Sequence, residues 1–185
     1  MTFLGPYLAA AALLVLAGAA KAWRPDDTAR AVRSLLPRLG LPAARRAVRV
    51  LASMESIAGL YALALPGRPA GVLVAASYAA FTAVVLVARR RGGVLASCGC
   101  FGRPDTPPTW LHACTVAALS ALSVPVAATA GHQRVVWSLL AGTPLHGVAM
   151  ALLVVVATSV GYLLLVGLPR LQAGRAPVHT PEAAG

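Results

Sequence analysis

The stretch FLGPYLAAAALLVLAGAAKA, residues 3–22, decides the fold class, because Lys21 is its only charged residue. Twenty residues of α-helix are about 30 Å long, which is the thickness of the hydrocarbon core of a bilayer. Four further stretches of similar character follow, at 47–65, 69–88, 109–130 and 146–168. We expect each of the five to form a transmembrane helix, with a kink at Pro125 in the fourth.

The composition of the whole chain supports this class. Hydrophobic residues make up 58% and charged residues 11% of the sequence, which lies far outside the norms of soluble domains. We therefore predict an all-α fold, a polytopic membrane bundle of about five transmembrane helices that forms one domain over residues 1–170. Residues 171–185 are rich in Pro, Gly and Ala without an apolar period, and we expect a disordered tail there.

The net charge of +11 is distributed unevenly among the connections. Fourteen of the sixteen basic residues lie in 21–49, in 89–108 and after Pro169, whereas the other side of the membrane would carry only Arg68 and Arg134. By the positive-inside rule this places the protein in the cell membrane with its N-terminus outside and its C-terminus in the cytoplasm. We expect these charges to bind membrane lipid and not nucleic acid.

The basic cluster follows the first apolar stretch, so we expect that stretch to be a retained helix and not a signal peptide.

A shorter amphipathic helix is expected between the first two spans. Asp26 and Asp27 follow Pro25, as is typical of a helix start. Apolar residues then recur at helical spacing opposite arginines, at Ala29, Val32, Leu35, Leu36 and Leu39. This pattern predicts an interfacial helix that ends near Pro37 and Gly40.

Glu55 is the only acidic residue within a predicted span. A charged side chain at the centre of a bilayer costs about 3 kcal/mol on insertion scales unless it faces the bundle interior and finds a partner, so Glu55 is a functional candidate. Gly59, one turn further on, would allow close approach of a neighbouring helix. The structural alternative is a carboxylate neutralised by Lys21 or hydrogen-bonded to another helix, and the two roles can coexist.

The motif Cys98-Gly99-Cys100-Phe101-Gly102 places two thiols one residue apart. Thiols at this spacing favour reversible disulfide chemistry or soft-metal binding, and the small ring of a Cys-x-Cys disulfide should be easy to break. Gly99 would let the backbone make the required turn. The structural alternative is that these cysteines are only small hydrophobic residues.

The third cysteine, Cys114, lies about five residues into the fourth span, at a depth close to that of Glu55. It is a candidate resolving thiol, with core packing as the alternative. His112 would complete a Cys-x-Cys…His-x-Cys set, but residues two apart on a helix point about 200° away from each other and so face one ion with difficulty. We therefore predict no resident metal and no cofactor, and the alternative is a soft-metal site that uses Cys98, Cys100 and one of these two residues.

The arrangement of several residues resembles the methylamine utilisation protein MauE family, described as MauE/DoxX-like redox-associated membrane proteins. The resemblance covers about residues 3–130, and it is carried by Lys21 with Trp23-Arg24-Pro25, Glu55 with Gly59, Phe81, and the Cys98–Gly102 motif. It implies a helical membrane bundle that assists the maturation of exported disulfide-bearing proteins beside a thioredoxin-like partner. By position, it implies that Cys98 and Cys100 are the redox pair and that Glu55 and Lys21 support them. The family's expected Arg-Asn pair at the head of the fourth span is replaced here by His112-Ala113.

The leading hypothesis is a membrane thiol–disulfide oxidoreductase, in which one thiolate of the pair attacks a partner disulfide and the other thiol resolves the mixed disulfide. The residues expected to act in this chemistry are Cys98, Cys100 and Glu55, supported by Lys21, Gly99, Phe101, Gly102 and Cys114. One alternative is a soft-metal binding or transport protein that uses the same cysteines. The other alternative is a structural membrane subunit.

Overall fold

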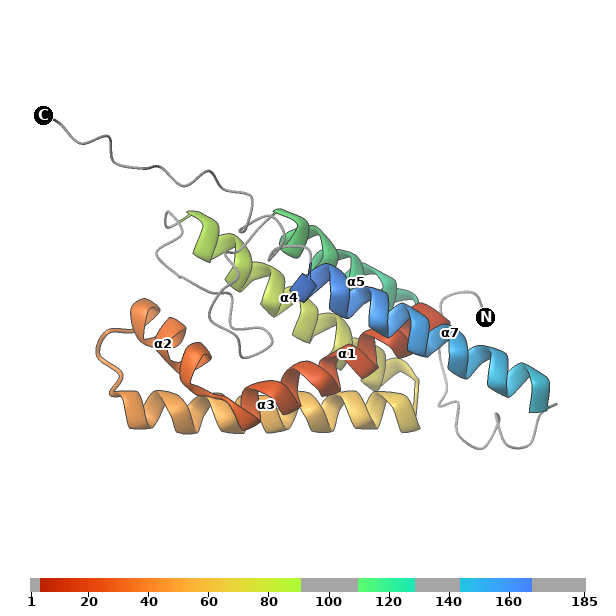
Figure 1. Cartoon of the computed structure of the whole chain (residues 1–185), viewed down its shortest axis with the longest axis horizontal. Helices are drawn as coiled ribbons and strands as arrows, with labels where there is room; N and C mark the ends of the chain where they lie inside the picture. The colour runs from red at the N-terminus through yellow and green to blue at the C-terminus, as the bar shows by residue number, and fades with distance from the viewer. Residues whose placement is uncertain (1–3, 91–109, 129–143, 168–185) are drawn as a thin grey trace, which may run out of the picture.

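The computed structural model describes residues 4–90, 110–128 and 144–167. Within these ranges the chain forms helices and no strand (Figure 1). The helices are α1 (Leu4–Trp23), α2 (Asp26–Leu35), α3 (Leu41–Ala64), α4 (Arg68–Arg90), α5 (Trp110–Ala128) and α7 (Pro144–Tyr162), and α7 continues into the π-helical turn η1 (Leu163–Gly167). Five of them, all except α2, are long and apolar enough to cross a membrane, which confirms the all-α membrane bundle.

Helix α1 lies at the centre of the bundle and contacts α3, α4, α5 and α7. Its closest neighbour is α3, and glycines on both helices allow the approach. A Cβ atom built on Gly59 of α3 would lie 2.7 Å from Cγ2 of Val15 and 2.8 Å from the carbonyl oxygen of Ala11. The role predicted for Gly59 is therefore confirmed, because no larger residue fits between these two backbones.

Helices α4 and α5 form a second close pair. Gly71 of α4 packs against the backbone of Ala127, and the hydroxyl of Ser120 donates a hydrogen bond of 2.9 Å to the carbonyl of Ala75. Helix α5 continues through Pro125. The pair therefore runs antiparallel, so the end of α4 and the start of α5 lie at the same end of the bundle (Figure 1).

The amphipathic helix α2 is confirmed, and it packs on α3. Ala29 of α2 is buried against Ala44 and Val48 in the first turns of α3. Acidic residues in the first turn of α2 suit the helix dipole, and α2 ends before Pro37 as expected. Helix α2 and the first turns of α3, which we call the basic hairpin (residues 26–49), therefore form a unit at one end of the bundle (Figure 1).

Helix α3 begins at Leu41, six residues earlier than the predicted span. Its 24 residues are about 36 Å long, which exceeds the hydrocarbon core by more than one turn. The added residues include Arg45 and Arg46, which are exposed, as is Arg49 one turn further on. The helix therefore extends past the apolar span, and its charged first turns belong to the basic hairpin.

Only the C-terminal part of α7 packs against α1. A Cβ atom on Gly161 would lie 2.7 Å from the side chain of Leu13, in the middle of α1. The earlier part of α7 extends past the start of α1 (Figure 1), and its side chains Val148, Leu152 and Val156 are exposed. The packing of helices α1 to α5 therefore depends little on most of α7.

Candidate intramembrane site

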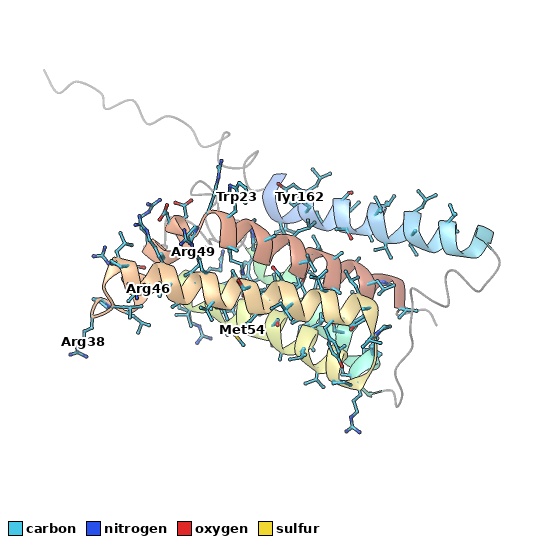
Figure 2. All side chains as sticks on the ribbon, turned by 90° about the horizontal axis from the view of Figure 1, so that it is seen from below. Trp23, Arg38, Arg46, Arg49, Met54 and Tyr162 are labelled. Carbon is cyan, nitrogen blue, oxygen red and sulfur yellow. The ribbon has the colours of Figure 1, made fainter. Side chains whose placement is uncertain are left out.

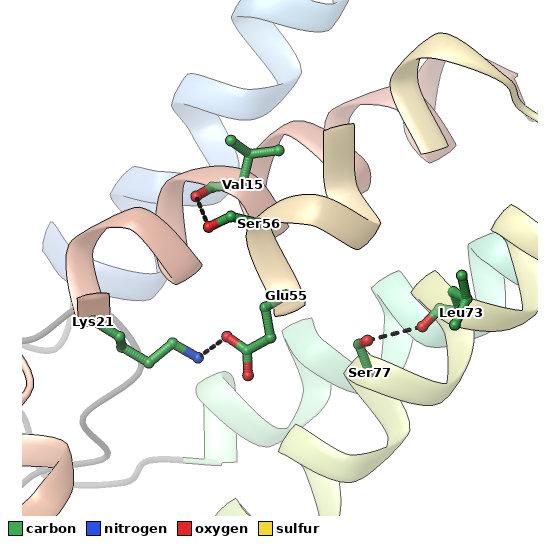
Figure 3. Close-up of polar contacts among 6 residues, drawn as sticks. All are labelled: Val15, Lys21, Glu55, Ser56, Leu73 and Ser77. Atoms are coloured by element: carbon green, nitrogen blue, oxygen red, sulfur yellow. Dashed lines mark hydrogen bonds and ion pairs between the residues drawn. The ribbon is translucent and has the colours of Figure 1, made fainter. Parts of the chain in front are cut away.

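An ion pair between Lys21 and Glu55 lies inside the bundle. Lys21 is in the last turn of α1 and Glu55 is in the middle of α3, and their ammonium and carboxylate groups are in direct contact (Figure 3). Only 7% of either side chain is exposed. The prediction that Glu55 faces the bundle interior and finds a partner is confirmed, and that partner is Lys21.

The position of Glu55 follows from the pattern of small residues on α3. The buried residues of this helix recur every three or four positions, at Ala44, Val48, Ala52, Glu55, Gly59 and Ala62. They form one face of the helix, and Glu55 is the only ionisable member of it. Because Gly18 packs against Ala52 and Ser56, α1 comes near enough for Lys21 to reach the carboxylate. The hydroxyl of Ser56 adds a long hydrogen bond of 3.5 Å to the carbonyl of Val15 (Figure 3).

An aromatic ring of α4 forms another wall of the site. The Nζ atom of Lys21 lies 4.4 Å from the centroid of the Phe81 ring, which is a cation–π contact. Phe81 makes an edge-to-face contact with Tyr78, with ring centroids 5.9 Å apart. The Tyr78 hydroxyl donates a hydrogen bond of 2.7 Å to the carbonyl of Ala10 on α1. Three helices therefore hold the ammonium group between a carboxylate and an aromatic face.

The first turn of α5 carries the residues that replace the family's expected pair. His112 and Ala113 are buried, with 2% and 3% of their surface exposed, whereas Cys114 is exposed. His112 and Cys114 therefore point in different directions, as helical geometry predicted. Within the described ranges, no three His, Cys, Asp or Glu side chains come together as a metal site would require.

The predicted redox motif, Cys98 to Gly102, lies outside the described residues, between Arg90 and Trp110. The guanidinium of Arg89 lies 4.9 Å from the centroid of the Trp110 ring and joins the two helix ends that flank the motif. Arg90 is nine residues beyond Phe81, or about 14 Å along α4. The described residues that flank the thiol segment therefore lie about 14 Å along α4 from the Phe81 ring that contacts Lys21.

The fold and the site together define a multi-pass helical membrane protein with a buried lysine–glutamate pair. The model of the family described as methylamine utilisation protein MauE matches residues 2–131, and the chain belongs to this family. No curated protein and no solved structure matches the chain. The matched residues include every predicted site residue and end before α7.

Proposed function

We propose that this protein is a membrane thiol–disulfide oxidoreductase, in which Cys98 and Cys100 exchange electrons with a thioredoxin-like partner and so assist the maturation of exported proteins. The observation that supports the proposal is the buried Lys21–Glu55 pair, whose Lys21 lies in the last turn of α1, on the side of the bundle where α4 ends and α5 begins. An intramembrane ion pair is costly to bury and is common where protons are handled.

The proposed chemistry is one cycle of thiol–disulfide exchange. One thiolate attacks the partner's disulfide, which forms a mixed disulfide and releases one partner thiolate. The second cysteine loses its proton and attacks the mixed disulfide, which releases the other partner thiolate. Two electrons have then passed to the partner, and the Cys98–Cys100 pair holds the disulfide. The reverse sequence oxidises the partner.

Glu55 and Lys21 are proposed to handle the proton that each attacking thiol must lose. The thiolate is the nucleophile, so exchange requires a proton acceptor near the thiol. Cys114 is exposed on α5, and we propose it as an additional resolving thiol. The matched family's name refers to methylamine utilisation, and none of the described residues points to that substrate.

Trapping of the mixed disulfide tests the proposal. In a Cys114→Ala background, Cys98→Ser or Cys100→Ser leaves one thiol that can attack but no thiol to resolve the adduct. One of the two variants should accumulate a reductant-sensitive adduct that mass spectrometry identifies as a thioredoxin-like protein. The Cys114→Ala protein, which keeps both thiols, is the matched control and should release its partner.

Two other results would contradict the proposal. Stoichiometric copper or zinc in the purified wild type, together with the absence of any adduct, would favour a soft-metal protein. Full activity of the Cys98→Ser/Cys100→Ser double variant in cells would favour a structural subunit, a role that the same ion pair could also serve.

A further inference from the structure

The basic hairpin carries more positive charge than its acidic residues balance. The described acidic residues are Asp26, Asp27 and Glu55, and each already pairs with a cation, namely Arg45, Arg30 and Lys21. Five exposed arginines at this end of the protein have no acidic partner among the described residues: Arg24, Arg33, Arg38, Arg46 and Arg49. A cluster of this kind has a strong attraction for anions.

Two of these arginines differ from the rest in their position on α3. Around the helix axis, Arg46 lies about 180° and Arg49 about 120° from the face of Ala44 and Val48, which packs on α2. Figure 2 shows them together near one end of the molecule, with Met54 farther along α3. Both arginines therefore point away from α2, and neither belongs to the apolar contact between α2 and α3 that holds the basic hairpin together.

An apolar stripe continues from these two arginines along the same face of α3. Val50, Ile57 and Leu60 lie within about 60° of Arg46 around the helix axis. They are 61%, 64% and 56% exposed, so no part of the described chain covers them. The change from arginine to apolar residues between positions 49 and 50 marks where the helix enters the hydrocarbon core.

We propose that Arg46 and Arg49 bind the phosphate of an anionic phospholipid whose acyl chains lie along Val50, Ile57 and Leu60. Guanidinium groups form paired, charge-assisted hydrogen bonds with phosphate, and two of them one turn apart can share one headgroup. The apolar stripe next to the arginines favours a lipid over an acidic soluble protein. Such a protein could bind the two arginines, but it could not reach Val50, Ile57 and Leu60 inside the hydrocarbon core. This proposal does not depend on the redox chemistry of the cysteines.

Lipid binding to the purified full-length protein in mild detergent tests the proposal. Native mass spectrometry would compare the retention of phosphatidylglycerol with that of phosphatidylcholine, and the wild type should retain phosphatidylglycerol selectively. Arg46→Gln/Arg49→Gln should weaken phosphatidylglycerol binding about 25-fold, since each cation near a membrane surface contributes roughly a fivefold preference. If this double variant does not fold, Arg49→Gln alone should lose about fivefold.

The matched control is Arg33→Gln/Arg38→Gln, which removes the same charge from arginines that lie away from the apolar stripe. It should change binding by less than about threefold if position matters more than net charge. Equal losses in the two double variants would overturn the proposal, as would equal retention of the two lipids by the wild type.

Two further results would assign the arginines to another ligand. Displacement of phosphatidylglycerol by glycerol phosphate, which has no acyl chains, would indicate a site for soluble phosphates. Unchanged lipid retention in Arg46→Gln/Arg49→Gln, combined with loss of binding to an acidic partner protein, would indicate a protein-docking surface.

Discussion

Replacement of Glu55 by glutamine should destabilise the bundle strongly, although the two side chains have almost the same shape. The change leaves the ammonium of Lys21 buried without its carboxylate. Removal of one partner of a buried ion pair typically costs about 3–5 kcal/mol. The Phe81 ring, 4.4 Å from Nζ, faces the ammonium in both proteins, so its contribution cancels, whereas the amide oxygen of glutamine can still accept a hydrogen bond from Lys21 and so limits the loss. We therefore expect a loss near the lower end of this range, about 3 kcal/mol.

Reversible unfolding in mixed detergent micelles, followed by circular dichroism, would measure this loss. The double variant Lys21→Met/Glu55→Gln should be more stable than Glu55→Gln alone, because it contains no unpaired buried charge. We expect a coupling energy between the two positions of about 1–3 kcal/mol. Additive effects of the two single changes, or a Glu55→Gln protein within about 0.5 kcal/mol of the wild type, would refute the conclusion that the two groups interact inside the bundle.

Two further predictions concern the packing of α1. Gly59→Leu should lower the free energy of unfolding by about 2 kcal/mol or more, because its Cβ alone would lie 2.8 Å from the carbonyl oxygen of Ala11. The matched control, Ala47→Leu on the exposed side of α3, should change the free energy of unfolding by less than about 0.5 kcal/mol in the same assay. Equal effects of the two changes would mean that α1 and α3 are not in close contact. Tyr78→Phe should lower the free energy of unfolding by about 1 kcal/mol, because it removes the hydrogen bond to the Ala10 carbonyl and keeps the ring contact with Phe81. An unchanged stability would mean that the Tyr78 hydroxyl does not bind the Ala10 carbonyl.

The membrane spans could be predicted closely because a bilayer leaves few alternatives. A chain in hydrocarbon must satisfy its backbone hydrogen bonds internally, so a long apolar stretch in this all-helical context becomes a helix. The start of α3 was missed by six residues. Arg45 and Arg46 lower the local hydropathy, so the predicted span begins only after them, but arginine is a good helix former outside the hydrocarbon core.

Which helices pack together was harder to predict than where they lie. Most faces of the spans are apolar, so hydrophobicity does not separate the inside of the bundle from the lipid-facing side. Glu55 was the exception, because burial of a single carboxylate requires an inward position and a partner. The contact of Phe81 with Lys21 depends on how α4 packs against the pair, and no local pattern encodes it. The burial of His112 was missed for the same reason, since α5 is apolar on nearly all sides.

The central position of α1 has a consequence for the biogenesis of this protein. Helix α1 is synthesised before α3, yet its Lys21 pairs with a carboxylate that is translated 34 residues later. Until α3 reaches the membrane, the ammonium must stay at the lipid headgroups, which its position in the last turn of α1 allows. Helix α1 therefore settles to its final depth only together with α3, and the glycine contacts between them form in the same step. Insertion of α1 and α3 is a paired event, and a defect in α3 should appear first as a mislocated α1.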